Sequence, residues 1–131
     1  MMSLSMRQWK GNRLQQTVVN VILYCFPSLH KEDAISTPAS VNGADVILSD
    51  KAKELFSYKV ECKNHNRIKA LYEHMNQAET HEGTEEPLVV FKSDKKPPLA
   101  VVHLNHFVEL TAYKAKYLEI TNKNNPERNI I

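Results

Sequence analysis

Two stretches in the first half of the chain decide the predicted fold: residues 43–48, Gly-Ala-Asp-Val-Ile-Leu, and residues 56–63, Phe-Ser-Tyr-Lys-Val-Glu-Cys-Lys. The apolar, β-branched run over 44–48 predicts a short strand. Residues 56–63 alternate polar and apolar side chains and are rich in strand-forming types, which predicts a second strand antiparallel to the first. Residues 49–55 between them are expected to form a connection with room for one helical turn.

Charged residues stand at the ends of these two predicted strands. Because side chains alternate between the faces of a strand, Glu61 and Lys63 should point one way and Cys62 the other. Asp45 begins the neighbouring strand, so strand pairing would bring two carboxylates and an ammonium group to one patch. Carboxylate oxygens suit Mg²⁺, which can hold a phosphate oxygen and activate a water, and a lysine can offset phosphoryl charge. The structural alternative is a charged strand end at the surface.

Three helices and two further strands are predicted around these stretches. Apolar residues at three- and four-residue steps predict helices over 9–26, 68–81 and 106–119, the last with Asn105 as its N-cap. Pro27 should end the first helix, and the polar composition of 28–42 predicts a loop. Apolar runs predict strands at 87–91, buried on both faces, and at 99–104. The order α-β-β-α-β-β-α indicates an α/β fold with a four-stranded mixed sheet flanked by helices.

Composition is typical of one ordinary globular domain. The chain has 131 residues, of which 42% are hydrophobic and 24% charged, and it is too short for a (β/α)₈ barrel. Its formal net charge of +2 excludes binding of polyanions through bulk charge alone but leaves room for a local basic patch. We expect one domain over 1–121 and a flexible tail over 122–131.

The two cysteines and the N-terminus indicate the compartment. Cys25 and Cys62 match no metal-binding spacing, and a pair is too few for a disulfide scaffold. The sequence predicts neither a signal peptide nor a membrane-spanning segment. We therefore expect free thiols in a cytoplasmic protein that has no membrane partner.

The chain resembles the PD-(D/E)xK nuclease superfamily, in particular its Holliday-junction-resolvase-like branch, which includes small phage-encoded members. The resemblance runs from about Arg13 to Leu110 and is most specific at Asp45, Glu61 and Lys63. It extends to the first helix, a serine-bearing polar loop, a helix with a Gln-Ala pair, the Pro-Leu-Val-Val-Phe strand and a closing helix opened by Asn-His-Phe. It implies a restriction-endonuclease-like core and an origin in a bacterial cell or a phage-infected host.

This resemblance also implies metal-dependent hydrolysis of DNA phosphodiester bonds, with Mg²⁺ as the cofactor and Mn²⁺ able to substitute. Asp45 and Glu61 would be metal ligands, the backbone carbonyl of Cys62 a further ligand, and Lys63 the catalytic lysine. Gln77 matches a position where the family often has a glutamine near the site and is counted with the catalytic candidates. A solvated helical glutamine is the alternative for this residue.

The chain departs from the family pattern in its first helix. Many members carry a metal-binding glutamate there, whereas this chain has Gln15 and Gln16. Either Glu32 or Asp33 substitutes for that glutamate, or the site uses fewer ligands. A carboxamide in the first helix can still contact a metal-bound water.

Basic and polar residues around the motif are the expected DNA contacts, because phosphate contacts supply much of the affinity for DNA. Some junction resolvases have a loop serine near the site, which here would be Ser36 or Ser40, and Ser40 stands nearer Asp45. The candidates for DNA binding are Arg7, Lys10, Arg13, Ser40, His65, Arg67 and Lys69. A solvated surface charge is the alternative for each basic residue.

The sequence thus predicts a Mg²⁺-dependent DNA endonuclease acting on branched DNA as a Holliday junction resolvase. We expect a homodimer, because a twofold-symmetric dimer matches the two symmetric cleavage points of a four-way junction. One alternative is a nuclease of the same fold with another DNA substrate, of the restriction or nicking type. The other is a catalytically inactive domain that binds DNA or protein.

Overall fold

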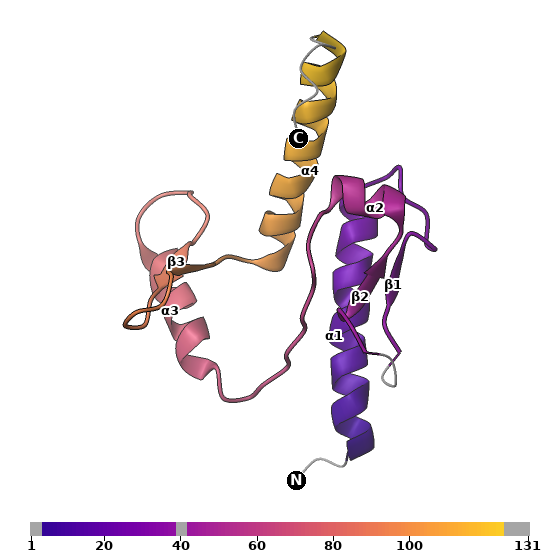
Figure 1. The fold of residues 1–131 in the computed structure, drawn as a ribbon. Helices are drawn as coiled ribbons and strands as arrows, with labels where there is room; N and C mark the ends of the chain where they lie inside the picture. Colours follow the sequence, from indigo (N-terminus) through magenta and orange to yellow (C-terminus); the bar gives the residue numbers. More distant parts are fainter. Residues whose placement is uncertain (1–3, 39–41, 125–131) are drawn as a thin grey trace. The chain divides into compact units, whose positions relative to one another are not determined.

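The computed structural model describes residues 4–38 and 42–124, with residues 4–12 and 124 described by their backbone alone (Figure 1). The described residues form a mixed α/β structure with four helices and two two-stranded antiparallel sheets. The chain divides into two compact units. The first unit comprises Met1–Asn64 and Val108–Ile131, and the second comprises His65–Phe107.

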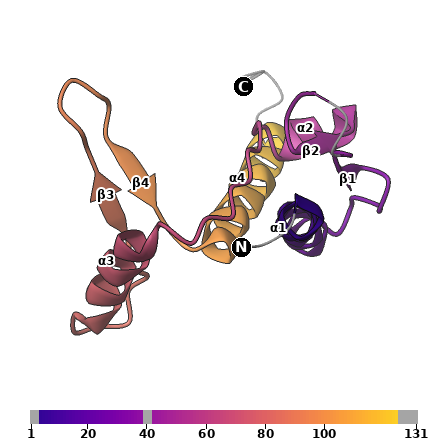
Figure 2. The same ribbon diagram turned by 90° about the horizontal axis from the view of Figure 1, so that it is seen from below.

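The first unit is built on a long helix and a small sheet. Its elements are α1 (Leu4–Cys25), β1 (Ala34–Ser36), β2 (Val46–Leu48) and α2 (Asp50–Leu55), together with the part of α4 (Leu104–Asn124) that follows Phe107. Helix α1 contacts both strands of the β1–β2 sheet, and Figure 2 shows α1 nearly end-on with that sheet beside it.

The core of this unit follows from the apolar spacing of α1. Val18 and Ile22 lie one helical turn apart and are buried, as is Phe26, whose N–H donates to the Ile22 carbonyl at 3.0 Å. Pro27 follows at once and ends the helix, as the sequence predicts. The other buried apolar side chains of the unit are Val19, Leu29, Ala34, Val46, Leu48, Ala52, Phe56 and Val108.

One hydrogen-bond network ties the start of α2 to the turn before β1. Ser49 is the N-cap of α2 and accepts from the Ala52 N–H at 3.1 Å. Its hydroxyl donates to Asp33 Oδ1 at 2.7 Å, and the His30 N–H donates to Asp33 Oδ2 at 2.7 Å. The His30 and Ser49 donors hold the pKa of Asp33 below its ordinary value. The ionised carboxylate therefore stabilises the fold at neutral pH, and this contribution is lost as the pH falls below about 4 through the lowered pKa.

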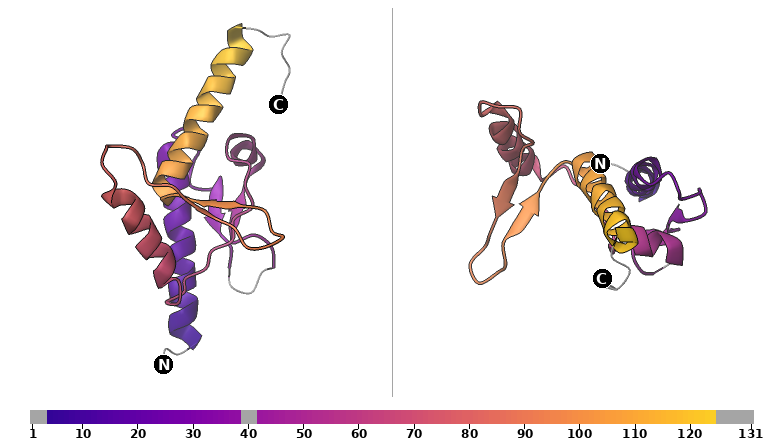
Figure 3. Two further views of the ribbon diagram at one scale, coloured as in Figure 1. Left: turned by 90° about the vertical axis from the view of Figure 1, so that its left-hand side faces the viewer. Right: turned by 90° about the horizontal axis from the view of Figure 1, so that it is seen from above.

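The second unit packs one helix on one hairpin. It contains α3 (Lys69–Thr80), β3 (Val89–Phe91) and β4 (Leu99–Val101), and Figure 3 shows α3 beside the hairpin that the two strands form. Met75 is buried, and the His74 ring meets the Phe91 ring edge-on at 5.7 Å. His103 Nε2 lies 3.0 Å from Glu79 Oε1, which links the end of the hairpin to the end of α3.

The three expected helices and three of the four expected strands are present, but α1 begins at Leu4 rather than Trp9 and α4 ends at Asn124 rather than Glu119. Helix α2 lies in the segment expected to be a connection with room for one helical turn. The expected helices at 9–26, 68–81 and 106–119 correspond to α1, α3 and α4, and the expected strands at 44–48, 87–91 and 99–104 correspond to β2, β3 and β4. Helix α4 begins at Leu104 rather than after Asn105, because the Phe107 N–H already donates to the His103 carbonyl at 3.1 Å. Residues 122–124 belong to α4 as well, and residues 125–131 lie outside the described part.

The pairing of β2 differs from the prediction. Its partner is β1, which lies in the segment predicted as a loop, with Ala34 opposite Leu48 and Ser36 opposite Val46. Residues 57–63 are extended but form no regular strand, and residues 57–59 line a groove together with β2. Among the described residues the strands therefore pair two by two, and the expected four-stranded sheet is not shown.

The expected burial of residues 87–91 on both faces was also wrong. Leu88 is 56% exposed and Val90 is 63% exposed. Side chains alternate along a strand, and α3 covers one face of this hairpin, on the side of Phe91. A continuous apolar run predicts a strand here but does not fix how many of its faces are covered.

We expect the Ser49→Ala variant to lose about 1 kcal/mol of folding free energy, the usual cost of removing a serine N-cap. Urea unfolding followed by circular dichroism measures this loss. Ser57→Ala is the matched control, because Ser57 is an exposed serine outside any helix. Equal stability of the two variants would show that the Ser49 network does not hold α2 in place.

Candidate functional site

The backbone around Asp45 is fixed on two sides. Gly43 precedes it with a φ of +123°, a conformation that favours glycine. The Thr37 N–H donates to the Asp45 carbonyl at 3.0 Å, which continues the β1–β2 pairing by one residue. On the other side, the Asp45 N–H donates to the Val60 carbonyl at 2.8 Å. These bonds place Asp45 between the small sheet and the extended segment that carries Glu61.

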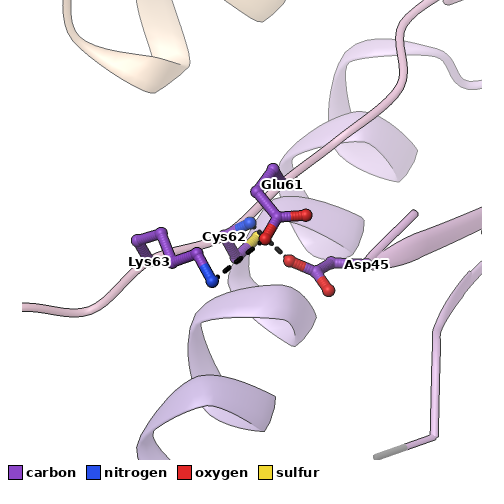
Figure 4. Close-up of polar contacts among 4 residues, drawn as sticks. All are labelled: Asp45, Glu61, Cys62 and Lys63. Atoms are coloured by element: carbon purple, nitrogen blue, oxygen red, sulfur yellow. Dashed lines mark hydrogen bonds and ion pairs between the residues drawn. The ribbon is translucent and has the colours of Figure 1, made fainter. Parts of the chain in front are cut away.

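The side chain of Asp45 makes a second link to that segment. Its Oδ2 accepts from the Cys62 N–H at 2.5 Å, and Figure 4 shows the Asp45 and Glu61 carboxyl groups pointing toward one another. Lys63 Nζ lies 3.1 Å from Glu61 Oε1, and these two side chains are 66% and 63% exposed. The structure therefore brings together Asp45, Glu61, Cys62 and Lys63, and it places Glu61 and Lys63 on one side of the chain as strand alternation predicts.

The Cys62 thiol lies in the same cluster but carries no charge at neutral pH. Burial raises its pKa, and the negative charges of Asp45 and Glu61 raise it further. A protonated thiol is a poor ligand for soft metals and a poor nucleophile. The chemistry offered by this cluster is therefore that of carboxylate oxygens beside an ammonium group.

The oxygen donors of the cluster suit Mg²⁺ better than a structural zinc ion. In the described residues no group of three or more His, Cys, Asp or Glu side chains is placed to hold a metal ion. A structural zinc site, which needs four nitrogen or sulfur ligands, is therefore not formed by these residues. Mg²⁺ is commonly held by one or two carboxylates while waters and substrate phosphates complete its shell. Asp45 and Glu61 fit that pattern, with one oxygen of each outside the two contacts described above.

The register of the β1–β2 sheet decides which acidic residue could add a further ligand. Asp33 lies at the end of the sheet opposite Asp45, since Ser49 pairs with Asp33 while Thr37 pairs with Asp45. Four residues of extended chain span about 13 Å. The Asp33 carboxylate is also engaged by Ser49 and His30. Asp33 therefore does not substitute for the missing first-helix glutamate, and Glu32 lies at the same far end.

Among the described side chains of the first helix, Gln15 comes closest to the role of the missing metal-binding glutamate. Its Oε1 accepts from the Ser36 hydroxyl at 2.8 Å, and Ser36 lies opposite Val46, the residue after Asp45. A carboxamide from α1 thus reaches the strand beside the Asp45 strand. The sequence identifies both residues individually but cannot show that they form a pair.

The remaining predicted site residues belong to α1, to the second unit or to the residues outside the described part. Arg7 and Lys10 lie on α1, where their side chains are not described, and Ser40 lies outside the described residues. Arg13 lies exposed on α1 in the first unit. Four predicted residues belong to the second unit, namely His65, Arg67, Lys69 and Gln77. Gln77 Oε1 lies 3.3 Å from His74 Nδ1, so its amide contacts a neighbour on the same helix.

The first unit also has a groove that sequence reasoning missed, lined by the residues on either side of Asp45 in the chain. It has a volume of about 570 Å³ and is lined by Ala44, Val46–Leu48 and Ser57–Lys59, with Lys53 at its rim. The available signal was the pair Tyr58–Lys59, an aromatic residue next to a lysine. These two residues were interpreted only as part of the predicted strand over 56–63.

Comparison of the chain with family models, with curated proteins and with solved structures finds no match. None of the helices in the described part is long and apolar enough to cross a membrane. Any function proposed for the chain therefore rests on the residues of the site and their geometry.

We expect the Asp45→Asn substitution to lower the pKa of the Cys62 thiol, because it removes a negative charge that raises this pKa. The pKa should stay above the ordinary thiol value, since burial is the larger cause. The rate of alkylation by iodoacetamide as a function of pH measures it, in a Cys25→Ser background so that one thiol reacts. Glu109→Gln is the control, because Glu109 raises the pKa of Cys25 instead. An unchanged Cys62 profile would contradict the placement of Asp45 beside Cys62.

Proposed function

We propose that the chain is a metal-dependent DNA endonuclease of the PD-(D/E)xK type that hydrolyses phosphodiester bonds in branched DNA, with the four-way junction as its substrate. The observation that carries the proposal is the convergence of Asp45 and Glu61–Lys63, joined by the Cys62–Asp45 hydrogen bond of 2.5 Å and the Lys63–Glu61 ion pair of 3.1 Å. These residue types match the motif that the sequence resembles. The proposal includes a restriction-endonuclease-like core with a four-stranded mixed sheet.

Each residue of the cluster has a distinct proposed task. Asp45, Glu61 and the Cys62 carbonyl would hold the Mg²⁺ ion. When bound, this ion supplies positive charge at the phosphate and lowers the pKa of a coordinated water. The Asp45 carboxylate also positions the 61–62 peptide through its bond to the Cys62 N–H.

Lys63 would act on the substrate itself. Glu61 holds the ammonium group beside the carboxylates, and the 66% exposure of the lysine side chain leaves it accessible to a phosphate. An ammonium group at this place offsets the charge that builds on the phosphoryl oxygens. It can also orient the attacking water by donating a hydrogen bond.

The proposed substrate requires two such sites. A four-way junction has two symmetric cleavage points, and a homodimer with twofold symmetry presents two identical sites to them. We therefore propose a homodimer with DNA as its partner.

A second candidate function is a domain of the same type that binds DNA without cleaving it. It is favoured by the ligand set, since the described residues place two carboxylates together and no third metal-binding side chain beside them. Where other members of the family have a metal-binding acid on the first helix, this chain has Gln15, which accepts a hydrogen bond from Ser36. Binding of junctions by a protein that leaves every DNA form intact would support this candidate.

We expect Glu61→Ala and Lys63→Ala to abolish cleavage while the fold and DNA binding persist. Loss of one group that stabilises developing charge costs about 10²–10³-fold in rate. The assay incubates a four-way junction, a linear duplex and a nicked duplex with the protein and Mg²⁺. Paired symmetric nicks in the junction alone support a resolvase, whereas cleavage of the duplexes supports the restriction or nicking type.

The matched control for these variants is Glu119→Ala. Glu119 forms an exposed ion pair with Lys123 at 3.5 Å on α4, so its removal breaks a comparable surface pair away from the cluster. Circular dichroism confirms that each variant is folded. Cleavage that survives in both Glu61→Ala and Lys63→Ala would refute the assigned site.

A further inference from the structure

A strand forms one side of the groove, and an extended segment forms the other. Val46–Leu48 of β2 form one side, and Ser57–Lys59 form the other. Ala44 and Val46 both line it, and they flank Asp45 in the chain. The groove therefore lies next to Asp45 along the chain, while the four cluster residues themselves are not among the described residues that line it.

The charge of the groove is positive. Lys53, from α2, and Lys59, from the extended segment, both line it and are exposed. None of the described residues that line it is acidic. A ligand that carries negative charge along its length complements these two ammonium groups.

The groove also offers an aromatic face. Tyr58 lines it and is 43% exposed, and its ring lies 4.9 Å from the ring of buried Phe56. The tyrosine ring thus packs on Phe56 and still leaves part of its surface open to solvent. A half-exposed aromatic ring in a groove that also holds two lysines is an arrangement on which unpaired bases stack while the backbone meets positive charge.

The size of the groove favours a small or single-stranded occupant over a duplex. About 570 Å³ is the volume of a site for a small molecule. This volume suits one or two unpaired nucleotides better than a double helix. Branched DNA supplies such unpaired or unstacked nucleotides at its branch point.

We propose that this groove binds a single-stranded stretch of DNA, with its phosphates on Lys53 and Lys59 and a base on Tyr58. This inference rests on the proposed function and names the part of the substrate that the site recognises. An acidic peptide could form ion pairs with the two lysines, but its carboxylate side chains have no ring to stack on Tyr58.

The test measures binding of a fluorescein-labelled oligothymidylate by anisotropy in EDTA, so that no cleavage is involved. We expect Lys53→Ala and Lys59→Ala each to reduce the salt dependence of binding, log K against log salt concentration, by about 0.7. Tyr58→Leu should weaken binding about tenfold, whereas Tyr58→Phe, which keeps the ring, should bind as the wild type does. Lys114→Ala on α4 is the control for charge, and thermal unfolding checks that each variant is folded.

Several outcomes would overturn the groove assignment. These are equal binding of blunt duplex and oligothymidylate through the same residues, equal competition by an oligoglutamate peptide or an RNA oligomer, or no effect of the three groove substitutions. Because the assay contains no divalent metal, a failure of cleavage leaves its result unaltered. Groove-dependent binding in a protein that never cuts DNA would contradict the nuclease proposal alone.

Discussion

The hydrogen bond from the Cys62 N–H to the Asp45 carboxylate holds the candidate site together. It spans 2.5 Å and joins two segments that form no regular sheet with each other. A backbone bond from Asp45 to Val60 at 2.8 Å supports it, and the Glu61–Lys63 pair then falls beside the Asp45 side chain. Hydrogen bonds to charged groups are worth about 1.5–3 kcal/mol. The position of the whole cluster thus depends on one carboxylate that has both a structural and a proposed chemical task.

The sequence predicts the cluster correctly although it predicts the sheet wrongly. Spacing placed Glu61 and Lys63 on one side of an extended chain, and extension alone, without strand pairing, preserves that alternation. The sequence could not show which segment pairs with β2. Ala34–Ser36 is three residues long and lies among turn-forming residues, so its pairing with β2 is set by contact with α1 rather than by its own composition.

Long-range side-chain contacts account for most of what the sequence left open. The Asp33–Ser49 network shows that an acidic residue considered for the metal instead holds Ser49, the N-cap of α2, at the far end of the sheet. The Gln15–Ser36 contact joins two residues far apart in the chain. The groove beside β2 exists because residues 57–59 separate from the strand after Asp45. None of these contacts has a local pattern, whereas the periodicity that predicts α1, α3 and α4 is entirely local.

The central claim is that Asp45 and Glu61 form one divalent-metal site at the start of β2. Paramagnetic broadening by Mn²⁺, recorded on the ¹⁵N-labelled protein, tests this claim without any substrate. The account predicts that broadening is strongest for the amide signals of Asp45 and Glu61–Lys63, that it is weaker at Asp33 and Ser49, which lie at the other end of the sheet, and that it disappears in Asp45→Asn. Broadening centred on Asp33, or broadening unaffected by Asp45→Asn, would contradict it.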